Sequence, residues 1–317
     1  MGRYTLRRLL QFAPTLFLAS VLVFLVIVSA PGDPARIKLG MEATDEQIAI
    51  ERARLGLDDP LPVRYLTWVS DVARFDLGRS FQSNRPVTDV ITTAFGYTAR
   101  LAAAAGVLGI VLGLSLGIVA ALNRGKRLDN AISAWAAAVL SVPSFVSGML
   151  LILVFAVALR WLPPSGAGEP DDFASQMRAL VLPALALGFP FAAILARFMR
   201  GALIEVLGQD YVLTARAKGL RPATIIGHHE VRNALIPTVT VMGIGLGSLL
   251  AGAVVVETVF SYPGLGRLVV SSIFNRDYPV VQAGLILGSA VFLGMSLLAD
   301  LAYGLLDPRI ALARAQE

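Results

Sequence analysis

Long apolar runs constrain the fold of this chain more than any other feature. A membrane-spanning helix needs about 20 apolar residues. Lipid offers no hydrogen-bond partners to an open backbone, so spans of this kind must be helices. Six such runs can be drawn, and they cover residues 9–30, 97–122, 131–159, 179–200, 237–260 and 281–306. The sequence therefore predicts an all-α membrane protein with six transmembrane helices, and proline at position 143 predicts a kink in the third.

Composition supports this fold and excludes several classes of function. Only 15% of the residues are charged, against about 25% in a soluble domain. Cysteine is absent, which excludes disulfides and thiolate metal sites. A net charge of +5 would suggest nucleic acid as a partner in a soluble protein. Here basic residues flank membrane spans, so we expect contact with lipid and none with nucleic acid.

The first apolar run has two interpretations. Three basic residues followed by an apolar run and Val28-Ser29-Ala30 are similar to a secretory signal peptide. However, the run at 9–30 exceeds the apolar region of about 7–15 residues that such peptides contain. Pro31 would also follow the cut directly. We therefore predict an uncleaved first span, with a signal peptide as the alternative.

The distribution of Lys and Arg predicts the orientation. If the N-terminus is cytoplasmic, segments 1–8, 123–130, 197–236 and 307–317 lie inside and carry 14 of the 27 basic residues. Another 8 lie in the long external segment 31–96, and long loops say little about orientation. Without that segment, 14 basic residues lie inside and 5 outside. Both termini are therefore predicted to be cytoplasmic.

Segment 31–96 is predicted to be a small helical insertion on the external side. Thr44 is a suitable N-cap and Gln47 follows at capping-box spacing, while Gly56 is a natural stop. A second short helix is expected after Pro60, with one apolar face formed by Val63, Leu66 and Val69. The insertion is either a cover over the helix ends or a contact for an external partner.

The sequence offers little support for catalysis. It contains no Gly-x-x-x-x-Gly-Lys-Ser/Thr loop, so we expect no P-loop nucleotide site. The only histidines, His228 and His229, follow one another in a predicted cytoplasmic loop, and no cluster has metal-ligand spacing. Ser147 lacks a histidine within the bundle, which disfavours a membrane serine protease. We predict no catalytic site.

Three ionisable residues, Arg197, Glu257 and Asp300, lie near or within spans. Charge inside a membrane is costly and is a functional hypothesis by default. All three lie toward span ends, where they can reach the interface or pair with a neighbour. The alternative is that Glu257 or Asp300 couples transport to protons or ions in a secondary transporter.

A polar, basic stretch between the fourth and fifth spans is unusual for this chain. Asp210 is a good N-cap for a short helix that continues to Lys218, and Gly219 can take the left-handed conformation that ends it. Pro222 suits the first turn of a further helix, and Pro237 is expected to begin the next span. Such regular start and stop signals are not needed in a disordered linker.

Small residues suggest what this short helix does. Ala215 and Ala217 keep part of it slim, so it could enter a groove on a partner protein. The alternative is a helix on the lipid surface, since Arg216, Lys218 and Arg221 could meet anionic headgroups.

At this point the sequence resembles a known family, the permease subunits of bacterial ABC importers of the dipeptide/oligopeptide/nickel type. The stretches TARAKGL and RNALIP, at 214–220 and 232–237, look like the peptide branch's spelling of the cytoplasmic EAA loop. The general pattern of this loop is Glu-Ala-Ala, three residues, then Gly. When its Gly is aligned with Gly219, the Glu-Ala-Ala falls on Leu213, Thr214 and Ala215. Only the last alanine and the glycine therefore match the pattern. The pattern's Leu-Pro falls on Val231 and Arg232.

Further matching strings lie in the family's order along nearly the whole chain. They are PGDPA, LGLDDPLPVRYLTW, DLGRSF, VPSF, VVVETVFSYPGLGRL, DYPVVQ and LLDPRI. They are similar to the member of the permease pair that carries the long first external loop. The resemblance implies one type I permease domain over 1–317, an external insertion at 31–96 and a coupling loop at 201–236.

The resemblance also implies a mechanism. The EAA loop would dock on a cytoplasmic ATPase, through coupling residues Asp210, Tyr211, Thr214, Ala215, Arg216, Ala217, Lys218, Gly219 and Leu220. Two ATP-binding subunits would bind ATP and Mg, so this chain needs no cofactor. A second homologous permease and an external solute-binding protein complete the assembly, in the bacterial inner membrane. The solute stays open among dipeptides, oligopeptides, glutathione, opines and nickel chelates.

The transport path is expected between this chain and its partner permease. Hydroxyl side chains are candidates to line it: Ser141, Ser144 and Ser147 in the third span, and Thr238, Thr240 and Ser248 in the fifth. Serine and threonine also join helices to one another in membranes, and this alternative applies to all six.

Overall fold

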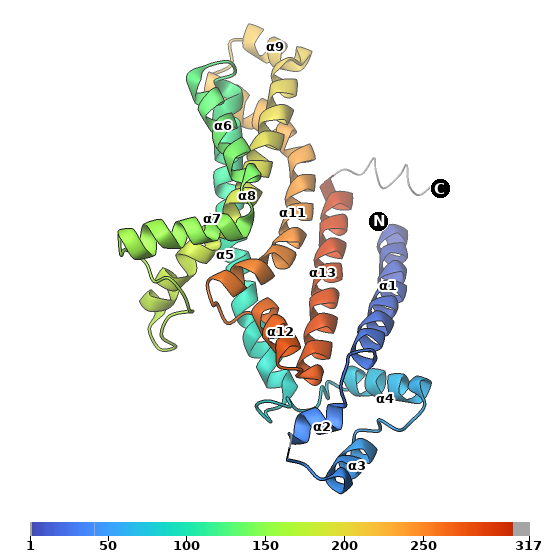
Figure 1. The fold of residues 1–317 in the computed structure, drawn as a ribbon. Coiled ribbons are helices and arrows are strands. Elements are labelled where there is room, and N and C mark those ends of the chain that lie inside the picture. The colour runs from blue at the N-terminus through green and yellow to red at the C-terminus, as the bar shows by residue number, and fades with distance from the viewer. Residues whose placement is uncertain (1, 41, 307–317) are drawn as a thin grey trace. The chain divides into compact units, whose positions relative to one another are not determined.

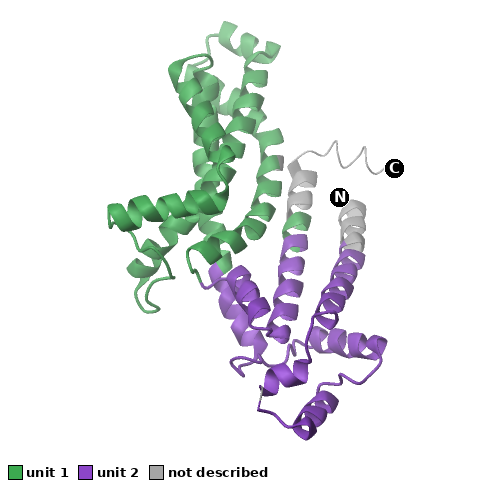
Figure 2. Cartoon of the chain, in the orientation of Figure 1, with its two compact units in different colours: residues 1–6, 98–262, 294–317 green, residues 7–97, 263–293 purple. Residues whose placement is uncertain are grey.

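The computed structural model describes residues 2–40 and 42–306. Within these ranges the regular structure is helical and contains no strand; one isolated β-bridge joins Arg79 to Pro86. The chain separates into two compact units, each described by itself (Figure 2). Unit 1 comprises residues 1–6, 98–262 and 294–317, and unit 2 comprises residues 7–97 and 263–293.

Each of the six apolar runs contains helix (Figure 1). Among the residues with described side chains, four helices are long and apolar enough to cross a membrane, and a bent pair of helices is a fifth span if counted as one. In α1 the side chains are described from Phe12 onward, and the helix is apolar over Phe12–Val28. The corresponding helices are α1 (Gly2–Val28), α5 (Val87–Leu122), α6 (Arg127–Ser141) with α7 (Ser144–Leu151) and the π-helical η1 (Ile152–Ala158), α8 (Phe173–Leu207), α11 (Arg232–Val259) and α13 (Tyr278–Leu306).

Small residues let two helices of unit 1 approach closely. A Cβ added to Gly109 would lie 2.4 Å from Phe191 Cδ1, and one on Gly113 would lie 2.8 Å from the carbonyl oxygen of Ala192. Gly117 meets Met199 Cβ in the same way, at 2.7 Å. Gly109, Gly113 and Gly117 repeat every fourth residue, so they lie on one face of α5, and this face forms the contact with α8. Glycines later in the chain are packed less uniformly, since a Cβ on Gly284 would lie 2.3 Å from Val269 Cγ2, whereas Cβ atoms at positions 247 and 288 would meet no described atom within 4 Å.

α8 is central to the packing of unit 1. It packs against α6, α7 and α11. Most residues in the middle of the helix are buried. Pro183 and Pro190 lie inside it without ending it. This central helix therefore connects the predicted transport helices to the polar segment that follows Leu207.

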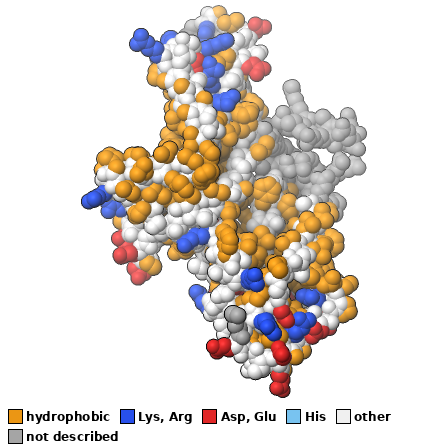
Figure 3. Space-filling view, viewed as in Figure 1, with side chains coloured by type: hydrophobic (Ala, Val, Ile, Leu, Met, Phe, Trp, Pro, Cys, Tyr) orange, Lys and Arg blue, Asp and Glu red, His pale blue; other side chains and the backbone are white. Residues whose placement is uncertain are grey.

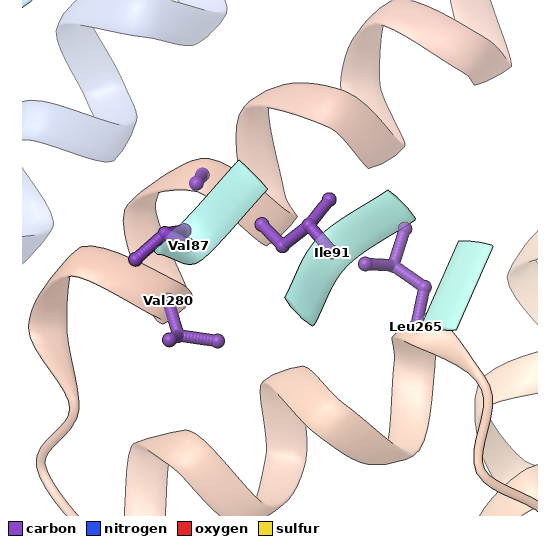
Figure 4. Close-up of a cluster of buried hydrophobic side chains, with 5 residues drawn as sticks. Val87, Ile91, Leu265 and Val280 are labelled. Atoms are coloured by element: carbon purple, nitrogen blue, oxygen red, sulfur yellow. The ribbon is translucent and has the colours of Figure 1, made fainter. Parts of the chain in front are cut away.

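Apolar and polar contacts between distant segments stabilise unit 2. Val87 and Ile91 of α5 pack with Leu265 of α12 (Leu265–Phe274) and with Val280 of α13 (Figure 4). Nearby, the carboxylate of Asp277 accepts hydrogen bonds from Ser80 Oγ at 2.5 Å and from the Phe81 amide at 3.0 Å. The DLGRSF and DYPVVQ stretches, far apart in the sequence, therefore meet at this carboxylate.

The insertion contains α2 (Pro34–Leu39), α3 (Asp45–Arg54) and α4 (Leu61–Ala73). The predicted capping box is confirmed: Gln47 N donates to Thr44 Oγ1 at 3.3 Å, and Thr44 N donates to Gln47 Oε1 at 3.0 Å. Gly56 has φ +61°, as expected of a stop. The second predicted helix is α4, with Pro60 as its N-cap.

α4 packs against α1. The hydroxyls of Tyr65 and Ser20 lie 2.7 Å apart, and the rings of Tyr65 and Trp68 contact Phe24 with centroids 5.4 and 6.0 Å away. α5 begins at Val87, ten residues before the apolar run at 97–122. Hydropathy marks only the apolar part of a helix, and the first turns of α5 are polar.

Candidate functional site

The short helix predicted between the fourth and fifth spans is α9 (Asp210–Ala217), at the top of unit 1 in Figure 1. Its N-cap is Gln209 rather than Asp210, which corrects the prediction by one residue. Asp210 is instead the first helical residue, where a carboxylate still suits the positive end of the helix dipole. Thr214 Oγ1 donates to the Asp210 carbonyl at 2.9 Å.

The end of α9 is a Schellman motif centred on Gly219. Gly219 has φ +70°, the left-handed conformation predicted from the sequence. Its amide donates to the Arg216 carbonyl at 3.0 Å, and the Leu220 amide donates to the Ala215 carbonyl at 3.3 Å. These two bonds satisfy carbonyls that a helix end leaves unpaired. The chain therefore turns sharply at a fixed point after α9.

Helical structure resumes directly after this turn. Pro222 occupies the first turn of α10 (Pro222–Thr224), as predicted, and the π-helical η2 (Ile225–Val231) leads into α11. Pro237 was expected to begin the next span, but it lies inside α11. The expectation was wrong because helical structure already begins with α10 at Pro222 and continues through η2 into α11.

The inner face of α9 packs against the segment that follows it. Val212 and Ala215 are buried with Ile225 of η2, and Val206 at the end of α8 packs on this cluster. Ala215 is 5% exposed, so it does not contribute to a slim outer face as the sequence suggested. Its spacing of three residues from Val212 puts both on the inner side. Ala217 is exposed.

An ion pair also joins α9 to η2. Arg216 Nη2 lies 3.0 Å from Glu230 Oε1; the Arg216 side chain is 53% exposed, while that of Glu230 is 1% exposed. The second oxygen, Glu230 Oε2, is buried without a hydrogen-bond partner among the residues that the structure describes. The Tyr211 hydroxyl accepts a hydrogen bond from Asn233 Nδ2 at 3.1 Å. Polar and apolar contacts together hold α9 against the start of α11.

The remaining coupling residues predicted from the sequence share one exposed surface, which we call the outer face of α9. Its members are Asp210, Tyr211, Leu213, Thr214, Ala217, Lys218, Gly219 and Leu220. Tyr211, Leu213 and Leu220 are 43%, 55% and 41% exposed. An outer face with apolar side chains, on a helix braced from behind, is suited to docking in a partner's groove. Sequence reasoning had left Leu213 out of the coupling set.

A second ion pair at the same end of unit 1 was not predicted. Asp129, at the start of α6, accepts from Arg200 Nε at 2.6 Å and from Arg200 Nη2 at 2.8 Å. The Gly125 amide donates to the same carboxylate at 2.9 Å. Asp129 is 2% exposed. The pair ties α6 to α8 close to the point where α8 leads toward α9.

The predicted path residues lie apart from α9. The hydroxyls of Ser141, Ser147 and Ser248 donate to carbonyls of their own helices at 2.7–2.9 Å. Ser144 is partly exposed at the start of α7. Thr238 is 1% exposed and donates to the Ala234 carbonyl at 2.8 Å, an arrangement that favours its alternative role in helix packing. Thr240 lies in α11, but its side chain is outside the described part.

The ionisable residues near spans have different surroundings. Glu257 is fully buried and accepts a hydrogen bond from Thr98 Oγ1 at 2.5 Å, which fits the structural alternative. Arg197 is exposed. The side chain of Asp300 lies outside the described residues. In the ranges with described side chains, no group of three or more His, Cys, Asp or Glu residues could hold a metal ion.

Two tryptophan variants separate the inner packing of α9 from its outer face. We expect Ala215→Trp to open the segment, because overpacking a tight apolar site costs about 1–3 kcal/mol. Ala217→Trp should leave the segment folded, since Ala217 is exposed. Limited proteolysis with proteinase K measures both: cleavage within 208–231 should rise several-fold for Ala215→Trp alone. Equal cleavage of the two variants would contradict the packing described above.

Comparison with known proteins supports a transport role. Residues 113–312 match the family described as "Binding-protein-dependent transport system inner membrane component". Residues 1–102 match the N-terminal membrane component of the same kind of system. The chain is 41% identical over 311 residues to a probable peptide ABC transporter permease protein, y4tP, of Sinorhizobium fredii, covering 98% of this chain and 99% of the relative. It is 43% identical over 310 residues to the glutathione transport system permease protein GsiC of Escherichia coli, with the same coverage.

Solved structures support the fold. A chain of the MetNI methionine ABC transporter, in an inward-facing conformation, matches with a TM-score of 0.57 at 21% identity, over 70% of this chain and 99% of that one. A chain of an amino acid ABC transporter matches with a TM-score of 0.52 at 17% identity, over 68% of this chain and 94% of that one. The type I permease fold expected from the sequence is confirmed. By its sequence matches, this chain belongs to the family of inner-membrane components of binding-protein-dependent transport systems.

Proposed function

We propose that this chain is one permease of a bacterial importer that carries peptides or related small solutes and is driven by ATP hydrolysis on partner subunits. The family and the relatives named above support an ATP-driven permease. One observation supports coupling of this chain to an ATP-binding subunit, and it is the outer face of α9. This helix surface is exposed and partly apolar, and the packing of Val212 and Ala215 and the Arg216–Glu230 pair hold the opposite side of the helix in place.

In this proposal two ATP-binding subunits bind ATP and Mg, and one of them receives the outer face of α9. A second homologous permease forms the path with this chain, and an external solute-binding protein delivers the solute. Both termini then lie in the cytoplasm, as the distribution of Lys and Arg predicts. Solutes related to those named for the relatives, peptides and glutathione, are the first to test.

The alternative, an ion- or proton-coupled secondary transporter, has less support. Its candidate coupling group in the described part of the chain, Glu257, is fully buried and hydrogen-bonded to Thr98. The family that the chain belongs to depends on binding proteins, which favours delivery of solute from outside.

Purification and reconstitution test this function directly. We expect the chain, extracted from its host in mild detergent, to bring down a second permease and two ATP-binding chains. In proteoliposomes the assembly should take up solute only with ATP inside and binding protein outside. A protonophore should leave uptake unchanged. Uptake that needs no ATP and collapses with the protonophore would instead support the secondary transporter. Calorimetry on the binding protein would identify the solute.

A further inference from the structure

The third apolar run is broken between α6 and α7. Val142 and Pro143 have extended backbones, with φ/ψ of −99°/125° and −57°/142°, and the helices on either side are bent by 106°. Figure 1 shows α7 turning away from α6 at this point. We call residues 141–144 the break. All its residues are accessible, with Ser144 the most covered of them.

A break of this kind leaves polar backbone groups without helical partners. The last carbonyls of α6 and the first amides of α7 cannot be paired within their own helices. Pro143 has no amide to offer, and its carbonyl is used by the Ser147 amide at 3.0 Å. The Ser141 hydroxyl donates back to the Ala137 carbonyl at 2.8 Å. The end of α6 therefore presents carbonyl oxygens at an accessible position.

The break lies at membrane depth if the proposed orientation holds, and in this respect the inference rests on the proposed function. Arg124, Lys126 and Arg127 would then mark the cytoplasmic surface at the start of α6. At 1.5 Å per residue, α6 from Arg127 to Ser141 rises about 21 Å. The hydrocarbon core is about 30 Å thick, so the break falls inside it.

Lipid cannot satisfy the unpaired groups of the break. Irregular backbone at this depth is tolerated only when it is buried in protein or lines a water-filled cavity. The surroundings of the break in this chain are apolar, because hydrophobic side chains gather over α7 and η1 (Figure 3). Among them are Phe145 and Met149 of α7 and Leu153 of η1, which are 46%, 55% and 56% exposed. The described residues of this chain leave the polar groups at 141–144 accessible, so in the assembled importer they are either covered by the second permease or face the water-filled path.

We propose that the break lines the solute path, and that the carbonyl oxygens at the end of α6 accept hydrogen bonds from ammonium and amide N–H groups of the solute. The C-terminal end of a helix carries partial negative charge, which favours a cationic donor such as the free amino group of a peptide. Ser141 and Ser144 flank these carbonyls and can exchange hydrogen bonds with a passing peptide backbone.

The break is held in position by α7. A Cβ added to Gly148 would lie 3.1 Å from Phe260 Cε2 and 3.4 Å from Val259 Cγ1, so α7 packs closely against α11. α7 also packs against α8. Groups fixed in this way pay little ordering entropy when a solute binds. The carbonyls therefore form a preorganised surface rather than a mobile loop.

Single-cysteine labelling tests this inference, and the chain has no cysteine of its own. Ser141→Cys is compared with Val111→Cys in the assembled importer, reconstituted in vesicles with membrane-impermeant methanethiosulfonate reagents on both sides. Val111 is a matched control because it is 58% exposed on α5. It also lies about 16 Å, at 1.5 Å per residue, from the end of that helix at Leu122. Labelling of the importer that contains the unsubstituted chain measures the background from the other subunits.

We expect Ser141→Cys to react at least tenfold faster than Val111→Cys. We also expect the cationic reagent to react faster than the anionic one, and the ratio of their two rates at Ser141→Cys to exceed the ratio of their rates with a free thiol in solution. Ser141→Cys as slow as Val111→Cys, with or without ATP and vanadate, would overturn the path. Fast labelling without cationic preference would overturn recognition by carbonyls. ATP-driven uptake by the Val111→Cys vesicles is measured alongside, so a failure of the proposed function is seen separately.

Discussion

Replacing Gly219 with valine is expected to uncouple ATP hydrolysis from solute uptake while leaving the chain inserted in the membrane. Gly219 has φ +70°, and a Cβ there would meet no described atom within 4 Å, so the substitution acts through the backbone. A left-handed conformation costs an L-residue about 1–2 kcal/mol, and more for a β-branched side chain. The Schellman turn should therefore open and release Leu220 and the end of α9.

The size of the effect follows from this cost. Because 1.4 kcal/mol corresponds to a tenfold change in an equilibrium, we expect the equilibrium between the closed and the open turn to shift about tenfold or more toward the open form. Uptake per ATP hydrolysed in proteoliposomes should fall as the open form becomes populated. Retention of the ATP-binding chains during detergent purification should weaken as well. Chain abundance in the membrane, measured by immunoblot, should stay near the level of the unsubstituted protein.

Gly227→Val is the matched control. Gly227 lies in η2, seven helical residues that follow the turn, and an added Cβ would meet no atom within 4 Å in the described part of the chain. It lies outside the left-handed region, so valine costs only helix propensity there. We expect near-normal coupling. If Gly219→Val also couples normally, the turn does not transmit force and the docking proposal loses its main support.

Local spacing predicted several features of the fold and of the site. The capping box at Thr44, the left-handed Gly219 and the first-turn Pro222 all follow from backbone rules that act within a few residues. The α5 glycines were predictable for the same reason, since a four-residue repeat places small side chains on one helix face. The inward position of Ala215 was also within reach, because Val212 three residues earlier marks an apolar face.

Contacts between distant segments could not be predicted in this way. Asp129 and Arg200 are 71 positions apart, and Thr98 and Glu257 are 159 apart. Nothing in either local sequence identifies the partner. The bend at Pro143 shows the same limit: proline predicts that a helix breaks, but the 106° angle depends on how α7 packs against α8 and α11. Tertiary packing therefore determines the pairing of distant side chains and the angle of the bend, which local sequence patterns do not specify.

The Arg216–Glu230 pair gives the second large expected effect. Arg216→Met would leave the carboxylate of Glu230, 1% exposed, without its guanidinium partner. A buried polar group stripped of its partner costs about 1–3 kcal/mol. We expect the lower part of this range, because Arg216 is half exposed and its charge is screened by solvent. The α9–η2 segment should loosen, and proteinase K should cleave 208–231 several-fold faster.

The double variant decides whether the stranded charge causes this loosening. Glu230→Gln removes the buried charge, so Arg216→Met with Glu230→Gln should recover most of the protection and of ATP-driven uptake. Lys218→Met, which removes an exposed cation at the end of α9, controls for the loss of positive charge and should behave like the unsubstituted chain. A double variant as sensitive as Arg216→Met would mean that the loss of the contacts made by Arg216, rather than the unpaired carboxylate, loosens the helix. Recovery would instead show that the unpaired carboxylate of Glu230, 14 residues beyond Arg216, causes the loosening, and that α9 stays packed on η2 when neither charge is present.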